Sequence, residues 1–124
     1  MQTIQMYATP DELSGSASSK FVETAQQAIR ERGRFLVSLS GGSTPMKLYA
    51  RLANENIDWS RVHFFWGDER CVPVDDPGNT YGSMRGILFD KIGTTNIHRV
   101  ESELEPASAA QAYAHTLSRF ADAP

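Results

Sequence analysis

The sequence predicts an α/β protein in which helices flank a parallel β-sheet. Two short apolar runs, Phe35–Leu39 and Val62–Trp66, are continuous enough to be strands buried on both faces, as in a parallel sheet. Longer stretches before, between and after them carry apolar residues at helical spacing. Because strands that alternate with helices are joined by right-handed crossovers, this order favours a parallel sheet covered by helices.

The amino-terminal third is expected to contain a strand and a long helix. Polar and apolar residues alternate over Thr3–Ala8, which is typical of a strand at a sheet edge. A helix is predicted from Pro10 to about Arg32, and Gly33 stands where a C-terminal cap belongs. Its apolar face consists of Phe21, Ala25, Ala28 and Ile29.

Three further helices and one short strand are predicted after Leu39. One helix opens at Pro45, a residue suited to the first helical position, and another runs from about Thr80 to Lys91. A short strand is expected over Ile97–Val100. The last helix would pack through an apolar stripe of Ala107, Ala110, Ala114, Leu117 and Phe120.

The chain of 124 residues is predicted to be a single α/β domain that is incomplete. About three strands are few for a sheet of this kind, which usually has five or six. A strand would be expected to follow the last helix in such an alternating series. Residues 1–124 are therefore interpreted as part of a longer domain.

Composition narrows the classes of partner. The chain is 40% hydrophobic and 22% charged with a net charge of −3, so no basic footprint for nucleic acid is present. The apolar runs are far shorter than a membrane span, and the first residues lack the features of a secretory signal. A single cysteine, Cys71, permits no internal disulfide and disfavours a cysteine-based zinc site. A cytoplasmic protein that binds neither nucleic acid nor membrane is expected.

The turn after the first apolar strand, Ser40-Gly-Gly-Ser-Thr-Pro45, predicts a cradle for an anion. Gly41 and Gly42 let the backbone turn tightly and approach a ligand closely. Free N–H groups at the start of the following helix favour negative charge, and Ser43 and Thr44 can cap them or bind phosphate oxygens. If the turn binds a ligand, a phosphate is the ligand it favours. The alternative is that the turn only caps the following helix.

A second polar cluster, Gly67-Asp-Glu-Arg70, follows the second apolar strand. Asp68 offers a proton acceptor, and Arg70 offers a planar donor fork for phosphate or carboxylate. Glu69 is expected to be structural, and the alternative for all three is a solvated salt-bridge cluster. Asn79 stands before a predicted helix, where it either caps that helix or faces the ligand.

The two clusters are expected to form one site, because the carboxyl ends of parallel strands meet at one edge of the sheet. The three histidines are assigned elsewhere. His63 is expected to be packed and hydrogen-bonded within its strand, His98 to lie at the surface, and His115 to face solvent.

Three segments together, SGGSTPMKLY, HFFWGDERCVP and GNTYGSM, resemble the amino-terminal half of the 6-phosphogluconolactonase family, which is grouped with the glucosamine-6-phosphate deaminases. The resemblance implies a Rossmann-like fold similar to that of the deaminases and of ribose-5-phosphate isomerase. It also implies hydrolysis of 6-phosphoglucono-1,5-lactone to 6-phosphogluconate, in the oxidative pentose phosphate pathway, without metal or organic cofactor. It leaves the oligomeric state open.

The resemblance also implies roles for individual residues. Gly41, Gly42, Ser43 and Thr44 would line the sugar-phosphate pocket, Asn79 would contribute to binding, and Asp68 and Arg70 would be the acidic and basic catalytic residues, with Arg70 binding substrate oxygens. Family members carry a later G-x-G-x-D-G-H segment whose histidine activates the attacking water, and this sequence has no such segment. The chain alone is therefore expected to be inactive.

Two alternatives remain at this point. One is a glucosamine-6-phosphate deaminase or sugar-phosphate isomerase, although the deaminases place a tyrosine where this chain has Arg70. The other is a non-catalytic fragment that binds a sugar phosphate.

Overall fold

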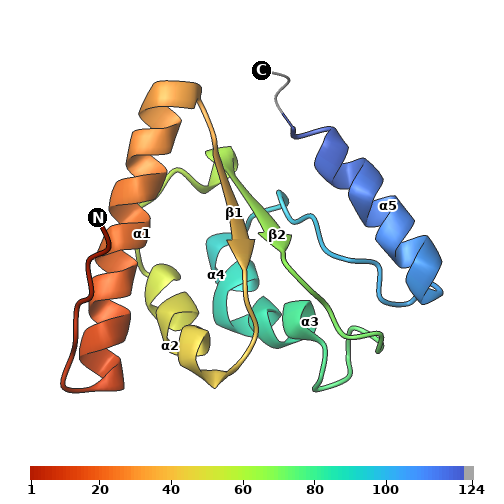
Figure 1. Ribbon diagram of the computed structural model, residues 1–124, viewed down its shortest axis with the longest axis horizontal. Coiled ribbons are helices and arrows are strands. Elements are labelled where there is room, and N and C mark those ends of the chain that lie inside the picture. Colours follow the sequence, from red (N-terminus) through yellow and green to blue (C-terminus); the bar gives the residue numbers. More distant parts are fainter. Residues whose placement is uncertain (122–124) are drawn as a thin grey trace.

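The computed structural model describes residues 1–121; residues 122–124, which the predicted domain included, lie outside the described residues. Figure 1 shows two parallel strands with helices on either side. The elements are α1 (Pro10–Arg32), β1 (Phe35–Leu39), α2 (Ser43–Leu52), β2 (Val62–Trp66), α3 (Thr80–Met84), α4 (Asp90–Ile92) and α5 (Pro106–Ser118). A 3₁₀ turn, Trp59–Arg61, precedes β2. The predicted α/β architecture is confirmed.

The sheet pairs β1 with β2 in parallel, in a register that sets Phe35 opposite Val62 and Leu39 opposite Trp66. The predicted strand at Ile97–Val100 is reduced to one parallel bridge between Phe64 and Ile97. Its hydrogen bonds run from the Phe64 N–H to the Asn96 carbonyl (3.0 Å) and from the His98 N–H to the Phe64 carbonyl (2.9 Å).

The predicted edge strand at Thr3–Ala8 is wrong. Residues 1–7 form no regular element, and Ile4 and Met6 are 82% and 91% exposed. An alternating pattern produces a strand only where it can pair with a sheet, and here no strand edge is paired with this segment.

Local signals fixed the limits of α1. The Thr9 hydroxyl caps the helix by accepting a hydrogen bond from the Glu12 N–H (3.1 Å), and the Glu12 carboxylate accepts one from the N–H of Ala8, the residue before the cap (3.1 Å). At the other end Gly33 adopts φ +79° and its N–H bonds the Ile29 carbonyl (2.9 Å), as predicted.

The predicted helix at Thr80–Lys91 contains a π-helical turn, Arg85–Phe89, between α3 and α4, and ends at Gly93 with φ +65°. The widened turn places Met84, Leu88 and Phe89 in the core together.

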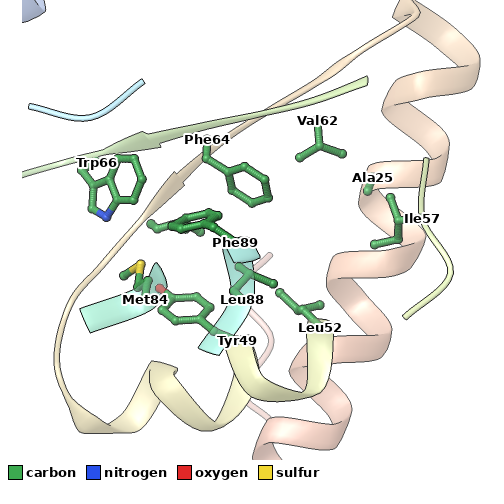
Figure 2. Packing of buried hydrophobic residues seen from close by; sticks show 11 residues of the cluster. Ala25, Tyr49, Leu52, Ile57, Val62, Phe64, Trp66, Met84, Leu88 and Phe89 are labelled. Atoms are coloured by element: carbon green, nitrogen blue, oxygen red, sulfur yellow. The ribbon is translucent and has the colours of Figure 1, made fainter. Parts of the chain in front are cut away.

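The main core lies between the sheet, the helices α1 and α2, and the segment formed by α3 and the π-helical turn. Figure 2 shows Phe64 and Trp66 pointing from β2 toward Phe89, which their rings meet edge-on at 5.2 and 5.7 Å. Both strand residues were predicted to be core residues, and this is confirmed. The cluster comprises Ala25, Leu39, Tyr49, Leu52, Ile57, Val62, Phe64, Trp66, Met84, Leu88 and Phe89.

The opposite face of β2 packs against the end of α5 and the segment around His98. Phe65 stacks on the His98 ring (4.8 Å between centroids) and meets Phe120 edge-on (5.1 Å). His63 Nδ1 and His98 Nε2 are 3.0 Å apart and share a hydrogen bond. The prediction for His63 is confirmed, as is the exposure of His115, whereas His98 is half-buried rather than at the surface.

Helix α5 packs through a face other than the predicted one. Ala109 is buried and Tyr113 is half-buried, with its hydroxyl accepting a hydrogen bond from the Trp66 N–H (2.8 Å). The predicted stripe was wrong in its first four positions, since Ala107, Ala110, Ala114 and Leu117 are exposed and only Phe120 is partly buried.

Strand β1 is also less covered than expected. Leu36 is 38% exposed and Ser38 is exposed, so this strand is not buried on both faces.

Within residues 1–121, no helix is long and apolar enough to cross a membrane.

The histidine pair should make the fold sensitive to mild acid. Burial lowers the pKa of both side chains; Arg34 adds to this effect at His63, and His63 and Arg119 add to it at His98. The unfolded chain therefore binds protons at higher pH than the folded chain, so stability should be full above about pH 6.5 and decline as the pH falls below it.

Urea unfolding at about pH 5.5 and about pH 7.5 would measure this dependence. His98→Gln should reduce the difference in free energy of unfolding between the two conditions. His115→Gln, which changes an exposed histidine of α5, is the matched control and should leave the difference unchanged. An equal difference in wild type and His98→Gln would contradict the prediction.

Candidate ligand-binding site

The turn between β1 and α2 forms a backbone cradle. Gly42 adopts φ +99° and ψ 167°, a conformation that is essentially restricted to glycine, and it caps α2 without a side-chain hydrogen bond. The helix begins at Ser43, two residues earlier than predicted, so Pro45 occupies its third position. The first amides of α2, with no side-chain cap, remain available to an anion.

Tyr49 holds the start of this cradle in place. Its buried hydroxyl donates a hydrogen bond to the Ser40 carbonyl (2.7 Å) and accepts one from the Ser40 N–H (3.1 Å). Burial raises the pKa of Tyr49, partly offset by the Ser40 hydrogen bond, so the hydroxyl remains protonated and able to donate.

Glu69 organises the loop after β2. Its carboxylate accepts hydrogen bonds from the N–H groups of Arg70 (2.8 Å), Thr80 (2.8 Å) and Tyr81 (3.0 Å). It thus ties the carboxyl end of β2 to the first turn of α3, which confirms the structural role predicted for Glu69.

Asn79 is used within the fold and does not line the cavity described below. It is 1% exposed; its Oδ1 accepts a hydrogen bond from the Gly82 N–H (2.8 Å), and its Nδ2 donates to the Ser102 hydroxyl (3.0 Å). Of the two roles considered for Asn79, the structure shows the helix cap, and a contact with the ligand stays a prediction.

A cavity of about 450 Å³ lies beyond the carboxyl ends of β1 and β2, beside the amino ends of α2 and α3. Both strands end at the lower side of the sheet in Figure 1. It brings together Gly41 and Gly42 from the first cluster and Asp68 and Arg70 from the second. Its lining comprises Ser40, Gly41, Gly42, Met46, Asp68, Arg70, Pro77, Gly78, Thr80 and Ser83.

Ser43 and Thr44 are not among the residues of this cavity. Both are exposed and line a neighbouring hollow of about 490 Å³ together with Tyr7, Thr9 and Lys47. Five of the six residues of the predicted phosphate turn thus line two different hollows, Ser40, Gly41 and Gly42 the first and Ser43 and Thr44 the second.

The side chains of Asp68 and Arg70 are exposed at the cavity, and neither forms an ion pair with any residue in the part of the chain that the structure describes. The salt-bridge cluster, the alternative considered for this motif, is therefore not what forms. A guanidinium that faces a cavity without a carboxylate partner can bind a phosphate or carboxylate oxygen through two parallel hydrogen bonds.

Gly41 brings the two halves of the cavity close together. A Cβ atom at Gly41 would lie 3.0 Å from the Thr80 hydroxyl and 3.1 Å from its methyl group. Across residues 1–121, no group of three or more His, Cys, Asp or Glu residues is arranged to hold a metal ion. The chemistry that this arrangement offers is the binding of an anion by backbone amides and a guanidinium, beside a free carboxylate.

A parallel α/β sheet with such a cavity at the carboxyl ends of its strands defines a class of proteins that bind small ligands at that edge. Within this class, the chain belongs to the family of glucosamine-6-phosphate isomerases and 6-phosphogluconolactonases, whose model matches residues 8–124. The resemblance found in the sequence is thereby confirmed.

Known relatives agree with this assignment. A 6-phosphogluconolactonase of Haemophilus influenzae is 49% identical over 76 residues, which is 56% of this chain and 33% of the relative. The crystal structure of a Shewanella baltica 6-phosphogluconolactonase superposes with a TM-score of 0.86 at 30% identity, over 92% of this chain and 50% of the other. That of the Thermotoga maritima enzyme gives a TM-score of 0.84 at 28% identity, over 88% and 51%.

The chain thus spans about half the length of these solved relatives and a third of the Haemophilus one. A monomeric glucosamine-6-phosphate deaminase, at 20% identity and a TM-score of 0.82, shares the fold.

Several residues that shape the cavity were not singled out from the sequence. Thr80 and Ser83 come from α3, and Pro77 and Gly78 come from the loop before it. One feature of the sequence indicated that these residues could reach the cavity: the loop that leads to α3 starts at the carboxyl end of β2. Tyr49 was not singled out either, and no local pattern indicated its hydrogen bonds with Ser40.

Glu69→Gln should destabilise the loop and weaken ligand binding together. The amide group of glutamine cannot accept hydrogen bonds through its nitrogen, so at least one of the three N–H groups loses its partner, at a cost of about 1–3 kcal/mol. Urea unfolding would measure the first effect, and titration with 6-phosphogluconate, the ligand proposed below, would measure the second. Glu23→Gln on the exposed surface of α1 is the control. Unchanged stability and affinity in Glu69→Gln would refute the proposed role of the carboxylate.

Proposed function

We propose that this chain is the amino-terminal half of a 6-phosphogluconolactonase domain and carries the part of the site that binds the sugar phosphate. The observation that carries the proposal is one cavity in which the Gly41–Gly42 turn meets Asp68 and Arg70, whose side chains form no ion pair within residues 1–121. The relatives named 6-phosphogluconolactonase supply the substrate class. A cytoplasmic location accompanies this metabolic role.

In the proposed reaction, water adds to the lactone carbonyl carbon of 6-phosphoglucono-1,5-lactone and the ring C–O bond breaks, giving 6-phosphogluconate. The step requires a base that takes a proton from water and donors that stabilise the oxyanion. The cradle amides and Arg70 would hold anionic oxygens, while Asp68 would accept a hydrogen bond from the sugar or from the attacking water.

No histidine that could activate the attacking water lines the cavity among the described residues. None of His63, His98 and His115 lines it. In the family resemblance the water-activating histidine belongs to a later segment. The chain alone should therefore bind the sugar phosphate and leave hydrolysis at the spontaneous rate.

Titration of ¹⁵N-labelled chain with 6-phosphogluconate tests the binding half of the proposal. Amide shifts are expected at Gly41, Gly42 and Thr80, and gluconate, which lacks the phosphate, should bind far more weakly. Lactone consumption above the blank is expected only when a second half of the domain is supplied. Equal binding of gluconate, or preferential turnover of glucosamine 6-phosphate by the completed domain, would overturn the assignment.

A further inference from the structure

We infer that His63, His98 and Phe120 form a latch, which holds the last turn of α5 against β2 and opens when both imidazoles are protonated. Figure 1 shows α5 running antiparallel to β2, so that the carboxyl end of the helix lies toward the start of the strand. None of the three residues lines the cavity of Gly41 and Gly42. The latch is therefore a feature of α5 and the sheet, separate from the proposed ligand contacts.

The two imidazoles of the latch are joined end to end by a hydrogen bond. His63 Nδ1 and His98 Nε2 are 3.0 Å apart, the ring planes differ by 19°, and the ring centroids are 5.3 Å apart. A centroid separation this large is reached at this N–N distance only when both nitrogens lie close to the line between the ring centres. The shared hydrogen bond is therefore nearly straight, which is the geometry that hydrogen bonds favour.

This geometry has room for one proton between the rings and excludes a second. In the neutral pair, one imidazole donates its N–H and the other accepts through its unprotonated nitrogen. A first added proton preserves the bond, because an imidazolium still has a neutral imidazole as its acceptor. When both rings are charged, two N–H groups face each other across 3.0 Å without an acceptor between them. The doubly protonated pair must therefore separate.

Cations on the neighbouring elements add to this repulsion. Arg34, just before β1, has its guanidinium 5.6 Å from the centre of the Phe120 ring, and Arg119 caps the end of α5. Burial lowers the pKa of both histidines; Arg34 adds to this effect at His63, and His63 and Arg119 add to it at His98. Among residues 1–121, no carboxylate is one of the groups that shift these pKa values. A second proton on the pair thus meets positive charge on each side.

Phe120 attaches α5 to the histidine pair. Its ring centroid lies 5.1 Å from that of His63, 4.5 Å from that of His98 and 5.1 Å from that of Phe65. Its N–H donates a hydrogen bond to the Leu117 carbonyl (3.0 Å), so the ring is tied to the last turn of the helix. Separation of the imidazoles displaces the surface on which Phe120 packs, and this turn then loses its attachment.

A second contact, which does not respond to mild acid, keeps the rest of α5 in place. The Tyr113 hydroxyl accepts a hydrogen bond from the Trp66 N–H (2.8 Å). Burial raises the pKa of Tyr113, partly offset by this hydrogen bond, so its hydroxyl stays protonated on both sides of neutral pH. The latch therefore opens locally, and the chain from Leu117 onward detaches while Tyr113 stays bound.

Leu117 extends the effect of the latch toward the candidate site. It lines the hollow between β1 and the end of α5 together with Phe120. It also lines an apolar hollow of about 380 Å³ whose wall includes Asp68 and Arg70. Opening of the latch moves Leu117 out of both hollows. Mild acid thus loosens the apolar wall beside Asp68 and Arg70.

The direction of the pH dependence follows from the pKa values of the open and closed forms. A detached histidine takes up a proton at its ordinary pKa of about 6.5, whereas the pKa is lowered in the closed latch. The latch is therefore closed above about pH 6.5 and opens as the pH falls below it. Between about pH 7.5 and about pH 5.5, the opening constant should rise about tenfold for one proton taken up and about a hundredfold for two.

An NMR titration of the 124-residue chain from about pH 7.5 to about pH 5 tests the latch. If the latch opens, His63 and His98 take up protons together, with one midpoint and a Hill coefficient greater than one. If the rings stay in contact, the charge on the first disfavours the second, and the pair titrates in two separate steps. The amide signals of Phe120 and Ala121 should move with the shared midpoint, while that of Leu52 in the core stays native.

His98→Phe separates protonation from packing. It removes the titrating group but keeps an aromatic ring against Phe65 and Phe120. The pH-dependent movement of the α5 amide signals should disappear, and His63 should titrate as a single group. His115→Gln, which changes an exposed histidine of α5, is the matched control and should behave as wild type does. A native Leu52 signal verifies that each variant is folded.

Several outcomes would overturn the inference. These are separate midpoints for His63 and His98, α5 amide signals that do not change with pH, and a wild-type pH response in His98→Phe. Loss of the native Leu52 signal at the shared midpoint would also overturn it, because the whole chain, and not the end of α5 alone, would then be released.

Discussion

Replacing Gly82 with alanine should cost more than about 3 kcal/mol of unfolding free energy, beyond the usual effect of overpacking. A Cβ atom at this position would lie 2.0 Å from the Val74 carbonyl oxygen and 3.1 Å from its carbonyl carbon. The contact is with backbone, so no side-chain rotation relieves it. The Gly82 N–H is held by Asn79 as well (2.8 Å), which fixes α3 against the loop.

The damage should extend to the ligand cavity, because the same loop carries Pro77 and Gly78 in the cavity wall. Urea unfolding followed by tryptophan fluorescence suits the measurement, since Trp66 is buried and meets the Tyr81 ring at 5.7 Å. Binding of 6-phosphogluconate should be lost in parallel.

Gly86→Ala is the matched control for this substitution. A Cβ at Gly86 meets nothing within 4 Å, and the residue lies in a helical turn. Alanine there should be neutral or stabilising by up to about 1 kcal/mol. If both variants lose the same stability, the contact with Val74 is not the cause.

The elements that the sequence predicted best are those bounded by strong local signals. Pro10 and the glycine after Arg32 mark the limits of α1, and β1 and β2 are continuous apolar runs. These signals act within a few residues, so they are legible without the tertiary structure.

The predictions that failed concern which faces of α5 and β1 pack against the rest of the protein. Helix α5 carries small apolar residues on two faces, so periodicity alone could not decide between Ala109 with Tyr113 and Ala110 with Ala114. Likewise the sequence of β1 predicts burial on both faces, and only the arrangement of neighbouring elements leaves Leu36 exposed. Leu36 and Leu117, one from each mispredicted surface, line the same hollow between β1 and the end of α5.

Part of the candidate site was predictable because some of its residues follow strands that are themselves evident in the sequence. Gly41, Gly42, Asp68 and Arg70 come directly after strands, and parallel topology brings strand ends together. The contribution of Thr80 depends on the hydrogen bond from its N–H to Glu69, a contact between residues eleven positions apart that no local pattern encodes. The burial of Asn79 depends in the same way on Ser102.

Arg70→Ala should reduce the affinity for 6-phosphogluconate by about ten- to a hundredfold and leave the unfolding free energy nearly unchanged. The loss follows from removing a charge-assisted hydrogen bond, which contributes about 1.5–3 kcal/mol. Stability should be spared because the Arg70 side chain is exposed and forms no ion pair within residues 1–121. Calorimetric titration and urea unfolding measure the two quantities.

Two further variants separate recognition by the guanidinium from a general effect of charge. Arg30→Ala removes the same charge from the exposed surface of α1, in the last turn of that helix and outside the lining of the cavity, and should bind as wild type does. Arg70→Lys keeps the charge but loses the planar donor fork, so its affinity should fall between those of wild type and Arg70→Ala. If Arg70→Ala unfolds the chain, or if Arg30→Ala weakens binding as much, Arg70 does not bind the ligand in the way proposed. Removing the same charge at Arg70 and at Arg30 therefore distinguishes an arginine that binds the ligand from one that is only solvated. The Asp68-Glu-Arg70 motif by itself does not distinguish them.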